Sequence, residues 1–159
     1  MLQFLRCFDR FLDARSQRVN GAKMRVKVYS DGASRGNPGI SAIAFMILDE
    51  DDKLLKTCSK YVGIRTNNQA EYEALISALE FASKLTDQEV TCFIDSELVA
   101  KQLNEAYKVR NPRLRALWLK VQELEQSFER VKFKSVPRTD IHIRQVDRLA
   151  NQALDRVRK

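Results

Sequence analysis

A strand that ends in an aspartate and a glycine-rich turn constrains this chain more than any other stretch. Residues 26–29 alternate between valine and larger polar side chains, which predicts a β-strand, and Asp31 follows at its end. Residues 32–39 contain three glycines and a proline, which predict an irregular turn. Ligand crevices in open α/β sheets lie at the carboxyl ends of strands, so Asp31 is a candidate site residue. Aspartate is also a common turn former, and this residue alone does not decide between the two roles.

The charge of the chain is positive and unevenly distributed. Its 159 residues carry 28 Lys and Arg against 21 Asp and Glu, a net charge of +7. Residues 106–122 hold five basic residues and no acidic one: Lys108, Arg110, Arg113, Arg115 and Lys120. Such a run is typical of a solvated face and also of a surface that binds a phosphate backbone, and the sequence leaves both open.

Cysteine and histidine are too few for the common metal and disulfide frameworks. Cys7, Cys58 and Cys92 are widely spaced, and His142 is the only histidine. These counts exclude an ordinary cysteine and histidine zinc site and argue against a secreted disulfide scaffold. No apolar run is long enough to span a membrane. We therefore expect a soluble, cytoplasmic protein without membrane contact.

The first 23 residues differ in pattern from the rest. Apolar residues recur there at helical spacing among arginines, which predicts an amphipathic extension that packs on the domain or on a partner: Leu2, Leu5, Phe8, Phe11 and Leu12. Two aspartates disfavour a targeting peptide, and Met24 offers an alternative start directly before the first strand. The sequence thus divides into an extension, 1–23, and a domain, 24–159.

The hydrophobic pattern of the domain predicts alternating strands and helices. Strands are expected at 26–29, 40–48, 54–62, 89–94 and 130–136, and helices after Thr66, over 96–106, from Asn111-Pro112 onward and after a loop at 137–143. Short connections between the first three strands favour antiparallel hairpins. The fold class is therefore α/β (α+β), with a mixed five-stranded sheet whose first three strands are antiparallel, flanked by helices.

Three further carboxylates stand out by position. Glu71 lies on the apolar stripe of its helix, although Asn68 and Glu71 also have capping-box spacing, as do Thr66 and Gln69. Asp95 ends the fourth strand, where it could equally cap the next helix. Asp147 lies at the edge of the buried stripe near the start of the last helix, where the helix dipole alone favours an acid.

These carboxylates suggest a metal site if the strand ends converge. Clustered carboxylates repel one another and raise each other's pKa values unless divalent cations neutralise them. Oxygen ligands without imidazole or thiolate indicate Mg²⁺ or Mn²⁺ rather than zinc. Two such ions can clamp a phosphodiester, and a basic protein suits that substrate.

Taken together, four segments resemble the type 1 ribonuclease H family across residues 24–159. They are residues 31–39 (DGASRGNPG), 66–71 (TNNQAE), 95–99 (DSELV) and 147–151 (DRLAN), in the family's order and spacing. The resemblance implies the ribonuclease H-like fold and Mg²⁺-dependent endonucleolytic hydrolysis of the RNA strand of RNA/DNA hybrids, leaving 5′-phosphate and 3′-hydroxyl ends. It implies that two ions are held by Asp31, Glu71, Asp95 and Asp147, with Mn²⁺ as a possible substitute and no small-molecule cofactor.

The resemblance also implies contacts with the substrate. The candidate nucleic-acid-binding residues are Gly32, Asn37, Asn67, Asn68, Lys108, Arg110, Arg113, Arg115 and Arg138. Asn37, Asn68 and the backbone around Gly32 match positions that contact the 2′-hydroxyls by which such an enzyme tells RNA from DNA.

Departures from the family pattern indicate a compact, archaeal-type member. The basic protrusion and a hybrid-binding domain are not expected, and Glu97 stands where a glutamine often contacts substrate. Arg138 resembles the compact members' replacement for a loop histidine, and His142 is expected to be a surface histidine. Compact members also accept double-stranded RNA, so this second substrate stays open.

Two other function classes share this pattern. A ribonuclease H-fold module could bind nucleic acid without cutting it, and a transposase or junction resolvase could use the same carboxylates. The Asn67-Asn68 pair and the Gly-Asn-Pro-Gly turn favour ribonuclease H. The sequence does not indicate an oligomeric state.

Overall fold

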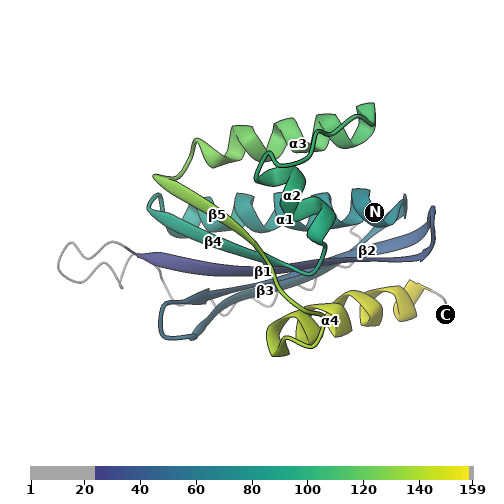
Figure 1. Cartoon of the computed structure of the whole chain (residues 1–159). Coiled ribbons are helices and arrows are strands. Elements are labelled where there is room, and N and C mark those ends of the chain that lie inside the picture. Colours follow the sequence, from purple (N-terminus) through teal and green to yellow (C-terminus); the bar gives the residue numbers. More distant parts are fainter. Residues whose placement is uncertain (1–23, 158–159) are drawn as a thin grey trace.

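The computed structural model describes residues 24–157, which form one sheet with helices on both faces (Figure 1). The predicted extension 1–23 and Cys7 lie outside the described residues. In chain order the elements are β1 (Arg25–Gly36), β2 (Gly39–Asp49), β3 (Leu54–Arg65), α1 (Asn67–Leu85), β4 (Glu89–Ile94), α2 (Glu97–Leu103), α3 (Pro112–Glu125), β5 (Arg130–Ser135) and α4 (Ile141–Val157). None of the helices in 24–157 is both long and apolar enough to cross a bilayer.

The sheet has the predicted mixed topology. Its strand order is β3-β2-β1-β4-β5. The pairs β1–β2 and β2–β3 are antiparallel, whereas β1–β4 and β4–β5 are parallel. The prediction of five strands with the first three antiparallel is therefore confirmed.

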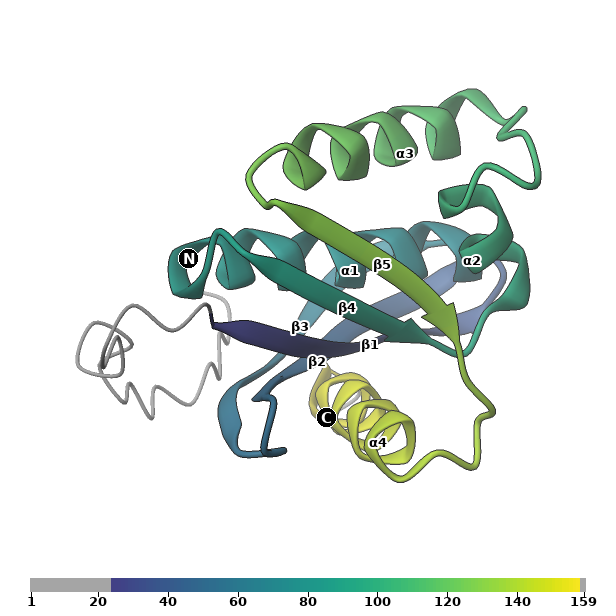
Figure 2. The ribbon, with the colours of Figure 1, turned by 60° about the vertical axis from the view of Figure 1, so that its left-hand side comes forward.

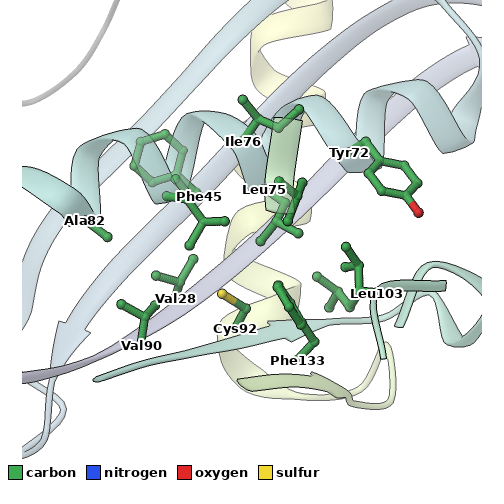
Figure 3. Packing of buried hydrophobic residues seen from close by; sticks show 14 of the residues in the cluster. Val28, Phe45, Tyr72, Leu75, Ile76, Ala82, Val90, Cys92, Leu103 and Phe133 are labelled. Atoms are coloured by element: carbon green, nitrogen blue, oxygen red, sulfur yellow. The ribbon is translucent and has the colours of Figure 1, made fainter. Parts of the chain in front are cut away.

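Two cores lie on opposite faces of this sheet. Helices α1, α2 and α3 cover one face and α4 covers the other, as two views show (Figures 1 and 2). Alternate residues of β2 divide between them: Phe45 and Ile47 belong to the larger core under α1, and Ala44 and Met46 to the core under α4. Figure 3 shows the larger core, where Cys92 is fully buried.

The first strand is longer than its sequence pattern predicted. Asp31 was expected at the end of the strand, but β1 continues to Gly36 because residues 30–36 stay paired with β2. The parallel pairing of β1 with β4 ends earlier, at Tyr29 and Phe93. Asp31 therefore lies just beyond the point where β1 and β4 part, and only one edge of the strand is still paired there.

Two helix boundaries differ from the prediction. Helix α4 begins at Ile141, inside the predicted loop, because the Asp140 carboxylate accepts hydrogen bonds from the backbone N–H groups of His142 and Ile143. Asp147 consequently lies in the second turn of α4, not at its start. Helix α2 ends at Leu103 instead of Ala106.

The basic connector leads into α3 as predicted. The Asn111 side chain accepts hydrogen bonds from the backbone N–H groups of Arg113 and Leu114, and Pro112 occupies the first turn. Trp118 packs against the larger core, and its indole N–H donates to the Gln102 carbonyl. The Trp118 ring is therefore held in place both by packing and by this hydrogen bond.

Strand β1 and the first turns of α1 approach so closely that only glycine fits between them. A Cβ atom on Gly32 would lie 2.3 Å from the carbonyl carbon of Ala70 and 2.5 Å from the nitrogen of Glu71. Real Cβ atoms do not come this close to backbone, so a side chain here would push α1 away from β1.

The first prediction concerns this contact. Gly32→Ala should lower the free energy of unfolding by about 2 kcal/mol or more, because neither backbone can yield without moving a whole element. Gly63→Ala is the control, since Gly63 has φ +85° but no atom nearer than the Arg65 guanidinium at 3.7 Å. The control should lose only about 1 kcal/mol, the penalty of the left-handed conformation. Urea unfolding measures both variants. An equal decrease in the free energy of unfolding for Gly32→Ala and Gly63→Ala would contradict the explanation by close backbone approach.

Candidate functional site

Glu71 is presented to β1 by a helix whose start is capped by other residues. The Thr66 side chain accepts from the Gln69 N–H, and the Gln69 side chain accepts from the Thr66 N–H. This capping box settles the alternative left open by the sequence: Gln69 closes the box and Glu71 does not. The Glu71 carboxylate is therefore free of the cap, and it is 8% exposed on the inward face of α1.

Three of the four predicted carboxylates meet in space. One oxygen each of Asp31, Glu71 and Asp95 lies within 4.8 Å of the other two. Asp31 is 4% exposed, so two of these three acids are buried. Each comes from a different element: β1, the second turn of α1 and the end of β4.

Asp95 is free of the capping role that its position suggested. Helix α2 is capped by Ser96, whose hydroxyl accepts from the Val99 N–H. The Asp95 carboxylate instead lies 3.2 Å from Nε of Arg138, and its side chain is 10% exposed. Arg138 itself is 91% exposed, so one face of its guanidinium is open to solvent beside the acidic cluster.

The fourth carboxylate, Asp147, borders the same cleft from α4. The cleft has a volume of about 780 Å³ and is lined by all four predicted carboxylates. Asp147 is exposed, and its backbone carbonyl and carboxylate both accept from the Asn151 amide, at 3.0 and 3.3 Å. Its side chain is also among the groups that raise the pKa of Asp31.

Burial and mutual repulsion perturb the two inner acids strongly. Desolvation raises the pKa of Asp31 well above its usual range, and the negative charges of Glu71 and Asp95 raise it further. Desolvation also raises the pKa of Glu71, while a hydrogen bond with Asp31 and the charge of Arg138 oppose the shift. Both shifts favour the protonated form, so we expect the pair to hold a proton near neutral pH until a cation replaces it.

The donor set fits a divalent cation. Oxygen Oε2 of Glu71 is buried and has no hydrogen-bond partner. The three clustered ligands are all carboxylates, the donors that Mg²⁺, Mn²⁺ and Ca²⁺ prefer. A cation at this point would satisfy the orphaned oxygen and remove the repulsion.

The predicted nucleic-acid contacts fall into three groups. Gly32, Asn67, Asn68 and Arg138 line the cleft with the carboxylates. Asn37 and Arg113 line an adjoining groove with Asn68, at the start of α3. Lys108, Arg110 and Arg115 line neither, although all three are exposed, and the Arg115 guanidinium lies 5.8 Å from the centre of the Trp118 ring.

Two residues have contacts that the sequence did not indicate. The side-chain oxygen of Asn37 accepts from the Asn67 N–H, so the tip of the β1–β2 hairpin is tied to the first turn of α1. His142 is half-buried, and its ring lies 4.5 Å from that of Tyr29 instead of standing free on the surface.

Sequence reasoning missed several polar residues of the cleft. They are Ser34, Ser96, Arg144, Arg148, Asn151, Gln152 and Asp155. Five of them lie on α4: Arg148 is next to Asp147, Arg144 and Asn151 are three and four residues from it, and Gln152 and Asp155 lie further along the helix. Helical spacing around a candidate ligand was the available signal, because residues three or four apart share a face.

Comparison with known proteins places this geometry in a family. Residues 29–153 match the family model described as reverse transcriptase-like. Ribonuclease HI of Halobacterium salinarum is 40% identical over 131 residues, which cover 82% of this chain and 65% of that protein. The crystal structure of RNase H1 from that archaeon has a TM-score of 0.79 and 40% identity, covering 83% of this chain and 98% of the other. The chain belongs to the type 1 ribonuclease H family.

Another type 1 ribonuclease H is similarly close. LC11-RNase H1, isolated from compost, was crystallised with an RNA/DNA hybrid and matches with a TM-score of 0.77 and 39% identity, covering 84% of this chain and 99% of that one. This ribonuclease H spans 65% of the Halobacterium protein and 36% of a bifunctional protein of Mycobacterium tuberculosis. Within the described residues no helix separates α2 from α3.

The second prediction follows from the raised pKa of Asp31. A carboxyl whose pKa is higher in the folded than in the unfolded protein destabilises the fold above its ordinary pKa of 3.8. Asp31→Asn should therefore raise the free energy of unfolding at pH 7 without divalent ions. A gain of about 1 kcal/mol or more is expected, since one pKa unit corresponds to about 1.4 kcal/mol.

The gain should disappear below about pH 4, where Asp31 is protonated in both states and repels nothing. Asp51→Asn, at an exposed turn, is the control and should change stability little at either pH. Thermal unfolding between pH 3 and pH 7 measures both variants. A destabilised Asp31→Asn at pH 7 would show that the carboxylate is paired favourably.

Proposed function

We propose that this ribonuclease H is an endoribonuclease that hydrolyses the RNA strand of RNA/DNA hybrids and leaves 5′-phosphate and 3′-hydroxyl ends. Mg²⁺ is the proposed cofactor, and Mn²⁺ a substitute. The observation that carries the proposal is the close approach of Asp31, Glu71 and Asp95 in an open cleft of a type 1 ribonuclease H fold. A relative at 39% identity has been crystallised with such a hybrid.

The proposed catalytic and metal-binding residues are Asp31, Glu71, Asp95 and Asp147. Divalent ions bound there would lower the pKa of an attacking water and stabilise the leaving oxygen of a phosphodiester. The chain itself holds the ligands in place beforehand: β1 fixes Asp31, and the capped α1 fixes Glu71. Arg138 orients Asp95 through its contact at 3.2 Å. Such preorganisation means that little rearrangement is needed when substrate arrives.

RNA is proposed to be distinguished from DNA by amides beside the carboxylates. Asn68 lines both the cleft and the adjoining groove, next to the backbone of Gly32. Asn37 uses its side-chain oxygen on the Asn67 N–H, which leaves its amide N–H groups for a substrate. Donors at these positions can bond with 2′-hydroxyls, which DNA lacks.

The other strand is proposed to lie along the basic residues near the start of α3. Arg113 lines the groove that adjoins the cleft, and Lys108, Arg110 and Arg115 are exposed nearby in the chain. Cations along this side supply the salt-dependent affinity for phosphates that the acidic cleft cannot supply.

A nucleic-acid-binding module without catalysis is the competing function. A module of that kind gains nothing from buried carboxylates, because they repel phosphate and lower affinity. Double-stranded RNA is the substrate to test beside the hybrid, since both duplexes present 2′-hydroxyls.

The third prediction tests the activity. With Mg²⁺, the wild-type protein should cut the RNA of an end-labelled RNA/DNA hybrid, and EDTA should abolish cutting. Asp95→Asn should reduce the rate about 10³-fold or more, because it removes a ligand of ions that supply several kcal/mol to the transition state. The matched control, Asp51→Asn, lies outside the cleft and should cut normally. Binding without cutting in Mg²⁺ and in Mn²⁺ would establish the binding module instead.

A further inference from the structure

Helix α4 lines the cleft with a row of polar side chains beyond the candidate metal ligand. Arg144 and Arg148 stand one turn apart and flank Asp147, and Asn151 and Gln152 continue the row. At 1.5 Å per residue the row from Arg144 to Gln152 extends about 12 Å along the cleft. That length covers more than one phosphate of a nucleic-acid strand.

Within the described residues, 24–157, the side chains of the two arginines form no ion pair. Both side chains are exposed. The third arginine of the cleft is engaged, because Arg138 contacts Asp95. Arg35, which does not line the cleft, pairs with Asp155 further along α4. Asp147 lies next to both, yet its hydrogen bonds are with Asn151.

The cleft requires positive charge on this side. Five carboxylates line it, Asp155 besides the four predicted ones, and an approaching phosphate is repelled by each of them that is ionised. The predicted cationic connector lies at the start of α3, on the opposite face of the sheet from α4 (Figure 2). Screening weakens exposed charges beyond about 8 to 10 Å, so cations on α4 itself act most strongly on phosphates that pass along that helix.

We propose that Arg144 and Arg148 bind backbone phosphates of the strand that is cut, next to the scissile phosphate. The proposal rests on the proposed function, because the cut strand is the one that reaches the carboxylates. Guanidinium groups suit this role, since each can donate two parallel hydrogen bonds to a phosphate. The basic residues near α3 then serve the complementary strand, so that the duplex is held from both faces of the sheet.

The fourth prediction concerns binding. Binding is measured with Mg²⁺ in an Asp95→Asn background, so that no strand is cut. In that background the double substitution Arg144→Gln, Arg148→Gln should raise the Kd for the RNA/DNA hybrid about tenfold at low salt. The slope of log Kd against log[KCl] should fall by between one and two units, because each lost phosphate contact removes about 0.9. Arg144→Lys with Arg148→Lys should restore the slope, because it keeps the charge.

A matched control removes the same charge elsewhere. Arg130→Gln with Arg156→Gln changes two exposed arginines that do not line the cleft. This pair should leave the salt slope within half a unit of the parent. In the cleavage-competent protein, Arg144→Gln with Arg148→Gln should raise KM and change kcat less than threefold, which distinguishes a binding contact from disruption of the metal site.

The strand assignment has its own test. A hybrid with one neutral methylphosphonate next to the scissile position should bind the parent more weakly when the methylphosphonate is in the RNA strand. The same change should have little further effect on the Arg144→Gln, Arg148→Gln protein, because the contact is already lost. The assignment would be overturned if a methylphosphonate in the DNA strand, and not one in the RNA strand, weakened binding of the parent but not of the Arg144→Gln, Arg148→Gln protein.

The outcomes separate this proposal from the proposed function. If the arginine pair and the control pair shift Kd and slope equally while the wild type cuts the hybrid, the α4 arginines are an ordinary solvated face and the proposal is wrong. If the wild type binds the hybrid but does not cut it, the nuclease proposal fails. The salt slopes then still decide whether α4 binds phosphate.

Discussion

The site depends on a backbone contact between Gly32 of β1 and Ala70 of α1, two residues that lie far apart in the sequence. At Gly32 the two backbones approach until no Cβ fits, and the residue after Ala70 is Glu71. On the strand, Asp31 directly precedes Gly32. The contact therefore brings two carboxylates together directly, and the parallel pairing of β4 with β1 adds Asp95 beside them. A wider separation between α1 and β1 would disperse the cluster.

This arrangement opposes the stability of the protein without ions. Asp31 and Glu71 lie where burial favours the protonated form, and one oxygen of Glu71 has no partner. The rest of the fold compensates with two cores and with contacts that hold the site elements, such as the Thr66–Gln69 capping box and the Asn37 bond to α1. Repulsion and desolvation of this kind are expected at a functional site. A cation that binds there is stabilised because it relieves the repulsion between the carboxylates.

Most of the fold and the identity of the carboxylates could be predicted, because strand periodicity, turn residues and helix caps act locally. The errors concern where elements begin and end, which the hydrophobic pattern alone does not define. The end of β1 depends on pairing with β2, and the start of α4 on whether Asp140 or a later residue caps it. In the sequence, either Glu71 or Gln69 could close the capping box at the start of α1. In the structure Gln69 closes it. Arg144 and Arg148 escaped prediction because a charged residue on an amphipathic helix is ordinary until a cleft is known to pass it.

A divalent cation that binds at the buried carboxylates should displace the proton that they hold. Titration calorimetry of Mg²⁺ at pH 7, in two buffers with different heats of ionisation, counts the protons released on binding. The wild-type protein should release about one proton per site when Mg²⁺ binds, because ligands must lose their protons to bind metal. Asp31→Asn should release fewer protons. Mg²⁺ binding without proton release, or the same release from Asp31→Asn, would contradict the account.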